Sequence, residues 1–564
     1  MNKGKEQISL LAMLMTEKGI THVVVSPGSR NAPVIIILSQ CKQLNMVSIA
    51  DERSAGFYAL GIALTTGRPV ALVCTSGSAS LNYAPAIAEA YYQKVPLLVI
   101  TADRPEEWID QGDGQTIRQE GIFANYIRKS YQLPVSAAMP DQQWYTERLI
   151  NEAIDRCLYP AAGPVHINLP LAEPLYNIAE QPSQPTVRNI RMAACETVVS
   201  EAELSRLTTR WNNAGRKMIL TGQLPQNLPL QSALDQLAQN DSVIVLTETT
   251  SNLYNPAYIG CIDRVIDGMD ESATAEFRPD ILLTFGGAVV SKKIKSLIRK
   301  MKPAEHWHTG DDPDEFYLDT YQSLTLTIPV KAEVFAGQLA ANSVNNPGSY
   351  RRLWHDRSSI RKQLHNRYTA SIQYSDFQVY DVLFNHIPVN TWVHLSNSTP
   401  VRYAQLFDHK PGFLTAANRG TSGIDGCVST AAGAASVSAD PVTVISGDIG
   451  FLYDSNALWN QQLDVRFRIV LINNGGGNIF RILEGPADFP AMEPYIETVH
   501  PYSAEGLVSA FGLNYFRATD KQSLLAVLDD FYDYSRQKAA LLEIFTPNIE
   551  SAKVLKDYFK FLNA

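Results

Sequence analysis

The chain has 564 residues, of which 45% are hydrophobic and 19% charged, and this balance excludes an extended disordered chain. Its formal net charge of -9 argues against a nucleic-acid-binding surface, because such a surface needs a basic patch. Six scattered cysteines form no Cys-x-x-Cys pair, so we expect neither structural zinc nor a disulfide framework. No apolar stretch reaches the length of a membrane span, and the N-terminus indicates an amphipathic helix rather than a signal peptide, so we expect a cytoplasmic protein.

Predicted strands and helices alternate along the first third of the chain. Apolar runs that stop at loops of small residues predict strands, and longer runs with helical spacing predict helices. The strands are expected at 21–26, 69–77, 95–102 and 163–171, and the helices at 54–66 and 80–92. This alternation predicts a parallel sheet covered by helices.

Two turn-rich stretches divide the rest of the chain. Residues 179–189, rich in Pro and Gln, predict a linker, and residues 342–349 predict a weaker break. Later strands are expected at 217–222, 242–248, 280–287, 391–396, 441–447 and 466–474. The predicted fold class is therefore α/β, with three doubly wound parallel-sheet domains at 1–185, 186–348 and 349–564. In such sheets, ligands bind at the carboxyl ends of the strands.

Several common motifs are missing from the sequence. It contains no G-x-G-x-x-G and no Walker A loop, so the usual dinucleotide and nucleoside-triphosphate sites lack support. His306 and His308 could bind a metal as a pair, although two nearby histidines on a loop are more often surface residues.

An aspartate stands where a buried strand is expected to end. Asp448 follows the apolar run 442–446, and Asn474 ends the next expected strand and precedes three glycines. Adjacent parallel strands would put the two side chains side by side. A carboxylate, an amide oxygen and a glycine carbonyl are hard ligands that suit Mg²⁺ and leave room for a diphosphate. The alternative is that Asp448 caps a helix starting near Ser455 and that the glycines form only a flexible turn.

Glu52 precedes a helix rich in small residues. Its plain interpretation is structural: Asp51 or Ser54 caps the helix, and Glu52 is a first-turn acid favoured by the helix dipole.

Together, these two features resemble the thiamine-diphosphate-dependent enzymes, in which a glutamate of the first α/β unit works with a GDG…N motif of the third. Here the metal motif is Gly447-Asp448-Ile449, a departure that is characteristic of one branch. The same branch is indicated by SPGSR (26–30), DER (51–53), TSGSA (75–79), TADRP (101–105), QTIRQ (115–119), NRGTSGIDG (418–426) and NNGGGNIF (473–480). Over essentially its whole length, the chain is similar to the 2-succinyl-5-enolpyruvyl-6-hydroxy-3-cyclohexene-1-carboxylate synthases of menaquinone biosynthesis.

The resemblance implies a thiamine diphosphate cofactor held by Mg²⁺ or Mn²⁺. Glu52 would bond the aminopyrimidine ring and favour the tautomer that activates the cofactor. Ile424 would wedge the cofactor into a bent shape, unless it is an ordinary core residue. Asp448, Asn474 and Gly476 would hold the metal, and Ser398 would also contact the cofactor.

The resemblance further implies two anionic substrates, 2-oxoglutarate and isochorismate. The first would be decarboxylated, and its succinyl carbanion would then undergo conjugate addition to the second. Arginine suits carboxylates because its planar fork binds both oxygens. The implied substrate-binding residues are Ser29, Arg30, Arg104, Gln115, Lys292, Lys293, Ser398, Arg402, Arg419, Ile479, Phe480 and Leu483.

One position of this set departs from the family pattern. Many relatives have Lys-Arg where this chain has Lys292-Lys293. Lysine keeps the positive charge but lacks the planar guanidinium that binds both oxygens of a carboxylate. For any single Arg or Lys, the alternative is a surface salt bridge of little energetic value. The resemblance also implies that the first unit of one subunit and the third unit of another share each active site. The expected assembly is therefore a homodimer, or a homotetramer of such dimers.

Two rival functions stay open at this stage. One is another thiamine-diphosphate carboligase, of the acetolactate-synthase type and using pyruvate, which predicts GDG and fewer arginines. The other is a catalytically silent homologue, which the loss of Glu52, Asp448 or Asn474 would indicate.

Overall fold

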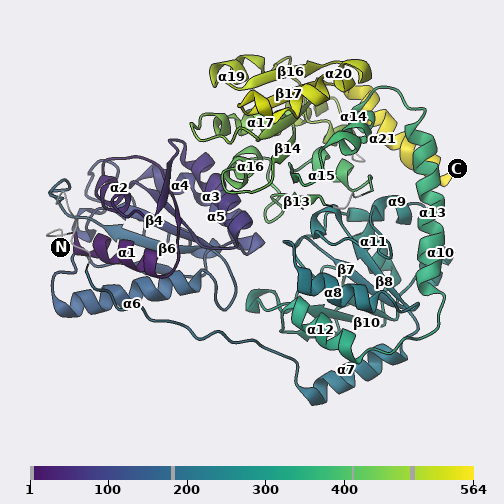
Figure 1. Cartoon of the computed structure of the whole chain (residues 1–564), viewed down its shortest axis with the longest axis horizontal. Helices are drawn as coiled ribbons and strands as arrows, with labels where there is room; N and C mark the ends of the chain where they lie inside the picture. The colour runs from purple at the N-terminus through teal and green to yellow at the C-terminus, as the bar shows by residue number, and fades with distance from the viewer. Residues whose placement is uncertain (1–4, 179–184, 409–411, 483–488) are drawn as a thin grey trace. The chain divides into compact units, whose positions relative to one another are not determined.

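The structure is a computed structural model that describes residues 5–178, 185–408, 412–482 and 489–564 (Figure 1). Three sheets organise these residues, and every strand pair in them is parallel. Helices alternate with the strands along the chain, so the predicted α/β class with parallel sheets is confirmed.

The first sheet has six strands among the described residues, in the order β2-β1-β3-β4-β6-β5. They are β1 (His22–Val25), β2 (Asn45–Ser48), β3 (Val70–Cys74), β4 (Leu97–Asp103), β5 (Ser130–Gln132) and β6 (Val165–Pro170). The apolar core on one face is completed by α1 (Glu6–Glu17), α2 (Ala32–Ser39) and α6 (Pro140–Arg156). Further helices of this part are α3 (Glu52–Thr66), α4 (Ser78–Asn82) and α5 (Ala84–Gln93), of which α3 packs on β1 and β3.

The middle sheet has five strands in the described part of the chain, in the order β11-β10-β9-β7-β8. They are β7 (Lys217–Thr221), β8 (Val243–Thr247), β9 (Ile281–Phe285), β10 (Glu305–Thr309) and β11 (Leu326–Ile328). One core is closed by α7 (Glu201–Asn213), α8 (Leu228–Leu237) and α12 (Ala332–Asn342). The other contains α9 (Ile262–Ile266) and α11 (Lys292–Met301), and α10 (Glu271–Glu276) lies beside α11.

The third sheet repeats the strand order of the first, as β13-β12-β14-β15-β17-β16. Its strands are β12 (Trp392–Leu395), β13 (Leu414–Ala416), β14 (Val442–Gly447), β15 (Arg468–Asn473), β16 (Asn514–Ala518) and β17 (Ala540–Phe545). The core is closed by α14 (Asp376–His386), α15 (Thr399–Ala404), α20 (Lys521–Phe531) and α21 (Asn548–Asn563). Shorter helices include α17 (Asp448–Tyr453), α18 (Ile479–Ile482) and α19 (Glu505–Ala510).

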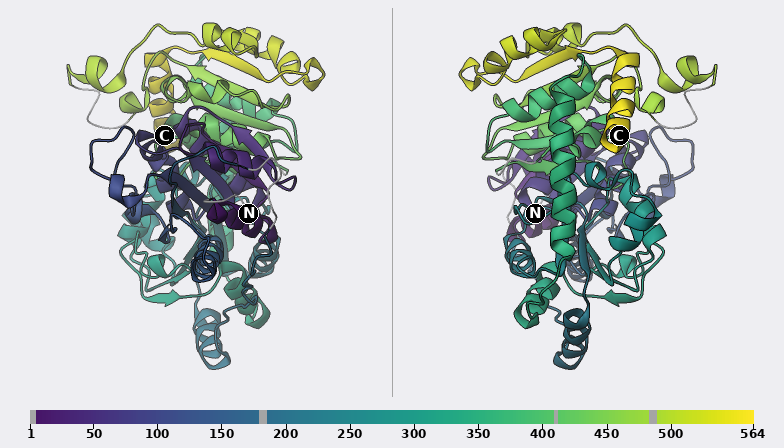
Figure 2. Two further views of the ribbon diagram at one scale, coloured as in Figure 1. Left: turned by 90° about the vertical axis from the view of Figure 1, so that its left-hand side faces the viewer. Right: turned by 90° about the vertical axis from the view of Figure 1, so that its right-hand side faces the viewer.

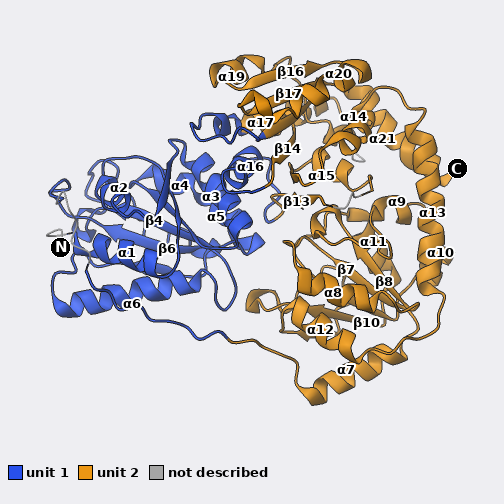
Figure 3. Cartoon of the chain, in the orientation of Figure 1, with its two compact units in different colours: residues 1–194, 420–439, 454–467 blue, residues 195–419, 440–453, 468–564 orange. Residues whose placement is uncertain are grey.

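The contacts of the chain define two compact units (Figure 3). Unit 1 comprises residues 1–194, 420–439 and 454–467, and unit 2 comprises residues 195–419, 440–453 and 468–564. Helix α13 (Tyr350–Thr369), the long helix in the right-hand view of Figure 2, explains why unit 2 holds two sheets. It packs on β8 and α9 of the middle sheet and on α14 and α21 of the third. The division into three domains therefore stays a prediction.

Within unit 1, helix α16 (Cys427–Ala435) packs along α3 at very short range. A Cβ atom added to Gly61 would overlap the carbonyl oxygen of Thr430, and one added to Gly433 would overlap the carbonyl oxygen of Tyr58. Glycine at these two positions lets the helix backbones approach each other.

Some local predictions differ from the structure. The helix expected at 80–92 is two helices, α4 and α5, that meet at Tyr83. Pro85 supplies the reason, since proline lacks the N–H that would continue α4 and fits the first turn of a new helix. The strand β2 was not expected, because it is short and partly polar. The predicted linker is described from residue 185, and residues 185–200 form neither helix nor strand.

Candidate active site

Two predicted arginines of unit 1 come together at the carboxyl edge of the first sheet. Arg30 follows β1 and is buried, and its guanidinium donates to the carbonyl of Leu171 at 3.1 Å and pairs with Glu173 at 3.1 Å. Arg104 follows β4 and pairs with Asp113. Burial lowers the pKa of Arg30, and the charge of Arg104 lowers it further, which shows that two like charges face one small region.

The polar residues predicted beside these arginines lie on neighbouring loops. Ser29 is exposed after β1, and Gln115 is exposed in the loop that follows β4. A Cβ atom at Gly77 would lie 3.3 Å from Gln115 Cα, so this loop passes directly over the end of β3. Gln115 has a left-handed backbone, with φ of 56°, which is uncommon outside glycine.

Glu52 is the first residue of α3, so the helix begins two residues before its expected start at Ser54. The Asp51 carboxylate caps the helix by accepting from the Ser54 amide at 3.1 Å. Glu52 is half-buried and faces the end of β3: burial raises the pKa of the Cys74 thiol well above its usual range, and the charge of Glu52 adds to this shift. Asp51 therefore caps the helix and Glu52 lies in its first turn, as the structural interpretation of this segment expected.

A buried polar chain fixes the start of α3. The Ser54 and Ser429 hydroxyls lie 2.9 Å apart, and the Ser429 amide and hydroxyl each donate to Asp454 at 2.7 Å. Asp454 is fully buried, and burial raises its pKa to about 7. The first turn of α3, which carries Glu52, is thereby tied to the first turn of α16.

Asp448 lies at the end of β14 in unit 2, beside the loop that follows β15. Its Oδ2 accepts from the amides of Gly475 at 2.8 Å and Gly476 at 3.0 Å, and its Oδ1 accepts from Ile449 at 2.7 Å. Gly475 has φ of 77°, a left-handed conformation that glycine adopts without strain. The expected pairing of the two strand ends is therefore present, and the expected helix near 455 is a separate short turn at Ser455–Leu458.

Asn474, beside the Asp448 carboxylate, has an amide oxygen that is not used in hydrogen bonding. Its Nδ2 donates to the buried Asp376 carboxylate at 3.0 Å, so its Oδ1 must point the other way. That oxygen is buried without a hydrogen-bond partner. Burial of an unpaired acceptor is costly, so an unpaired amide oxygen beside a carboxylate and a glycine loop fits a hard cation. The described residues hold no cluster of three or more His, Cys, Asp and Glu that could bind a metal, so this amide and carbonyl set is the better candidate.

His500 also contacts this set, and the sequence analysis missed it. Its Nδ1 accepts from the Tyr502 amide at 3.1 Å, and its Nε2 lies 3.4 Å from Asp448 Oδ2. No local motif could have revealed this contact.

Cations of unit 2 gather near the loops after β12 and β13. Ser398 has φ of 76° at the start of α15, and the buried Nε of Arg402 has no hydrogen-bond partner. Arg419 donates to Asn397 at 2.8 Å, which joins the two loops.

Lys295 of α11 interacts electrostatically with both of these arginines. Burial lowers its pKa, Glu248 raises it, and Arg419 and Arg402 lower it again, so these groups share one electrostatic neighbourhood. Lys292 is exposed at the start of α11, and three residues along a helix put Lys295 on a similar face. The sequence analysis missed Lys295, because spacing alone does not show which face of α11 meets the arginines.

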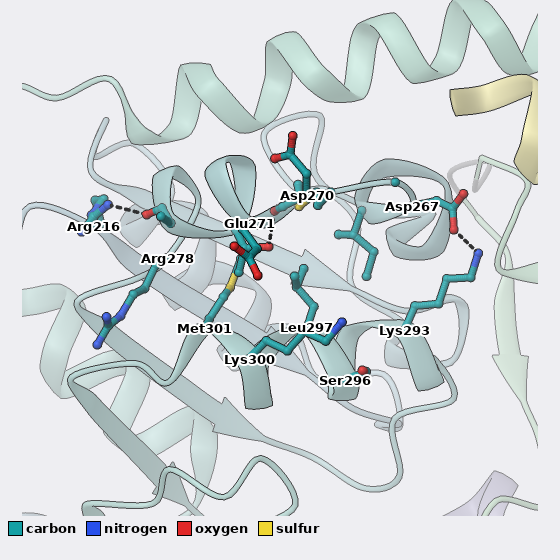
Figure 4. A pocket seen from close by; sticks show the side chains of 15 residues that line it. Arg216, Asp267, Asp270, Glu271, Arg278, Lys293, Ser296, Leu297, Lys300 and Met301 are labelled. Atoms are coloured by element: carbon teal, nitrogen blue, oxygen red, sulfur yellow. Dashed lines mark hydrogen bonds and ion pairs between the residues drawn. The ribbon is translucent and has the colours of Figure 1, made fainter. Parts of the chain in front are cut away.

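Lys293 has a different environment. Its ammonium pairs with Asp267 and lies 3.1 Å from the centre of the Phe559 ring, and it lines a pocket of the middle sheet (Figure 4). The pocket mixes both signs of charge, with Arg216, Arg278 and Lys300 opposite Asp270 and Glu271. Lys293 is therefore already neutralised by a carboxylate.

The apolar residues predicted to face the substrate are half-buried. Ile479 and Phe480 begin α18, directly after the glycine loop, and Ile424 lies in the loop before α16 in unit 1. Leu483 lies outside the described residues.

The interpretation of His306 and His308 as a surface loop pair is wrong. Both are buried in β10 and share the Thr284 hydroxyl, at 2.9 and 3.0 Å. Burial lowers the pKa of His306 to about 4, as expected for a neutral core histidine.

Comparison with known proteins decides the family. Residues 7–122 match the model of the thiamine pyrophosphate enzyme N-terminal TPP binding domain, and residues 398–544 match the C-terminal TPP binding domain. The first segment contains Glu52, and the second contains Asp448 and Asn474.

Three relatives carry one name, 2-succinyl-5-enolpyruvyl-6-hydroxy-3-cyclohexene-1-carboxylate synthase. The protein from Flavobacterium johnsoniae is 43% identical over 551 residues, 97% of each chain. That from Christiangramia forsetii is 42% identical over 569 residues, 98% of each chain. That from Porphyromonas gingivalis is 40% identical over 570 residues, 99% of this chain and 97% of its own. This chain belongs to the 2-succinyl-5-enolpyruvyl-6-hydroxy-3-cyclohexene-1-carboxylate synthase family.

Membership confirms three predictions from the sequence. The chain is an enzyme of this synthase family, it has the two domains that bind thiamine diphosphate, and its family works in menaquinone biosynthesis. Along the described residues, none of the helices has both the length and the apolar character needed to span a membrane.

Proposed function

We propose that this protein decarboxylates 2-oxoglutarate and adds the resulting succinyl carbanion to isochorismate by conjugate addition, giving the product named by its family. Thiamine diphosphate, when bound, supplies the nucleophilic carbon and accepts the electrons left by carbon dioxide. The observation that carries the proposal is the pair of half-sites on the two thiamine-binding segments: Glu52 in the first turn of α3, and Asp448 beside the unpaired Asn474 oxygen.

The proposal assigns a separate role to each residue that would contact the cofactor or its metal. Glu52 would share a proton with a ring nitrogen of the aminopyrimidine, and Ile424 would press on the cofactor from the loop before α16. Asp448, Asn474 Oδ1 and the Gly476 carbonyl would hold Mg²⁺ or Mn²⁺, which also binds diphosphate oxygens. Ser398, strained at the start of α15, would contact cofactor and substrate.

The cationic loops would bind the substrate carboxylates. Arg30 and Arg104 offer a paired positive region in unit 1, and Arg402 and Arg419 offer a second in unit 2. Two arginines that lie close together repel each other, and an anion that binds between them relieves this repulsion. Ser29 and Gln115 would add polar contacts, Lys292 would add positive charge, and Ile479, Phe480 and Leu483 would keep water from the reacting carbon. The charge implied for Lys293 is paired with Asp267 and has no part in this proposal.

We also propose the assembly and the location. A homodimer would form each active site from unit 1 of one subunit and unit 2 of the other, and two dimers would form a homotetramer. The proposed location is the cytoplasm.

The test follows isochorismate consumption by purified protein with thiamine diphosphate and Mg²⁺, first with 2-oxoglutarate and then with pyruvate. Consumption should require 2-oxoglutarate and fall by roughly 10²–10⁴-fold in Glu52→Gln, the range for loss of acid–base catalysis. Glu201→Gln is the matched control, since Glu201 is also the first residue of a helix, α7, and is exposed.

The rivals predict different outcomes. Equal rates with pyruvate would contradict the proposed substrate and favour the acetolactate-synthase type. No turnover while the cofactor still binds would favour the silent homologue.

A further inference from the structure

A buried carboxylate of the first unit holds the loop that contains Ile424. Glu89 lies in α5 and is 1% exposed. Its Oε1 accepts from the Gly420 amide at 2.7 Å, and its Oε2 accepts from the Thr421 amide at 2.7 Å and the Thr421 hydroxyl at 2.5 Å. Gln93 donates to Oε1 from the next turn of α5. Four donors use the full accepting capacity of a carboxylate.

The loop backbone lies directly on α5 at this point. A Cβ atom added to Gly420 would come within 2.6 Å of the Glu89 carbonyl oxygen and 3.0 Å of Tyr92 Cβ. A side chain at position 420 would therefore lift the loop from the helix and break the bonds to Glu89. The contact therefore requires glycine at position 420.

The anchored loop is irregular between β13 and α16. Residues 420–426 form turns and bends, and Ser422 and Gly426 have left-handed φ values of 63° and 68°. Ile424 stands in the middle of this loop, and Arg419 directly precedes Gly420 in the sequence. A loop without regular backbone hydrogen bonds needs side chains to fix its position. Glu89 accepts three hydrogen bonds from two successive residues of this loop.

We propose that Glu89 is a positioning residue of the active site, which holds loop 420–426 so that Ile424 meets the bound cofactor at a fixed place. The inference rests on the proposed function, because it concerns the cofactor contact assigned there to Ile424. Glu89 itself touches no reacting atom. Carboxylate–amide bonds are strong and directional, so they suit a residue that must not move between catalytic cycles.

The test measures exchange of the thiazolium C2 proton of bound thiamine diphosphate with deuterium, with no substrate present. In Glu89→Gln, an NH₂ group replaces one acceptor and faces the loop amides, so the loop is displaced. Exchange should slow about 10- to 100-fold, the cost of a misplaced catalytic contact. The double variant Glu89→Gln/Ile424→Ala should exchange no more slowly than Ile424→Ala alone, since both changes remove one interaction.

Two further sets of variants separate positioning from folding. Glu147→Gln is the matched control, because Glu147 is also a buried helical glutamate of unit 1 bonded to a glutamine four residues away, at 3.2 Å. It should leave the exchange rate within twofold of wild type. Should Glu89→Gln fail to fold, Thr421→Val removes one donor only and should slow exchange, and Thr421→Ser should restore the rate.

The outcomes distinguish this inference from the proposed function. A wild-type protein that exchanges no faster than the free cofactor, or independently of Glu52, overturns the proposed function. Fast, Glu52-dependent exchange that persists in folded Glu89→Gln and in Thr421→Val overturns only the role of Glu89, as do additive effects with Ile424→Ala.

Discussion

The first and third sheets have the same strand order and carry different chemistry. In both sheets, the first strand has the second strand on one side and the third strand on the other. The direction of the strand order therefore reverses between β1 and β3 and between β12 and β14. Loops at such a reversal are where doubly wound sheets bind ligands. The loop after β3 is uncharged at Thr75–Gly77, and α17, which directly follows β14, begins with Asp448. After the fourth strand, the first sheet has Arg104 and the third has Asn474.

The difference shows that topology fixes where a site forms and side chains fix what it does. The first sheet offers the cations Arg30 and Arg104 and the Glu52 carboxylate. The third offers the oxygen ligands that suit a metal and its diphosphate. Glu52 belongs to unit 1 and Asp448 to unit 2, so each unit holds half of the proposed chemistry.

The largest expected effect comes from substituting the key carboxylate of each unit separately. Glu52→Gln and Asp448→Ala should each lower turnover by at least roughly 10²-fold, the first by loss of proton sharing and the second by loss of the metal ligand. Only Asp448→Ala should also abolish metal-dependent cofactor binding, measured by titration calorimetry.

Mixing these two inactive variants sharpens the comparison. If subunits share each site, a hybrid dimer regains one intact site, and statistical mixing should restore about a quarter of wild-type activity. Hybrids purified with two different tags and left inactive would contradict the shared site.

A smaller effect is expected from the lysines of α11. Lys295→Gln removes a charge beside Arg402 and Arg419 and should raise the KM of one substrate by roughly tenfold, the value of one charged hydrogen bond. Lys293→Gln, whose charge is already paired with Asp267, is the control and should change KM less. Steady-state kinetics with each substrate varied would show the contrast, and equal effects would contradict it.

Two helical glycines provide a stability test. Gly433→Ala should destabilise unit 1 by about 1–3 kcal/mol, because the new Cβ overlaps the Tyr58 carbonyl on α3. Gly337→Ala in α12 meets open space and should stabilise the protein by about 0.5–1 kcal/mol. Chemical denaturation of both variants would test the claim, and a neutral Gly433→Ala would contradict the close packing.

The last comparison is a pH dependence of stability, with one group in each unit. Burial raises the pKa of Asp454 in unit 1 and of Glu248 in unit 2 to about 7. Since the folded state then holds protons that the unfolded state has lost, stability should fall as pH rises from about 4.5 to about 7, by at most about 1.4 kcal/mol per pH unit for each group. Asp454→Asn and Glu248→Gln should each flatten the dependence of Tm on pH. An unchanged slope in both would contradict the raised pKa values.

Several site residues were predictable because their signals are local. Asp448 and Asn474 each end an apolar run, and Glu52 opens a helix rich in small residues, so strand and helix spacing locates them. The choice between Lys293 and Lys295 was not predictable in this way, because it depends on which face of α11 meets the arginines. His306 and His308 were misjudged for the same reason: only the sheet shows that their short segment is a buried strand.

The sequence by itself determined the α/β class, the parallel sheets, the loops that carry the chemistry and the family. Each of these follows from residues close together in the chain, where periodicity, caps and motifs act. Only the tertiary structure decided that Glu89 holds Gly420, 331 positions away, that His500 faces Asp448, and that α16 packs on α3. Such contacts depend on strand order and on the path of the crossovers, so no local pattern encodes them.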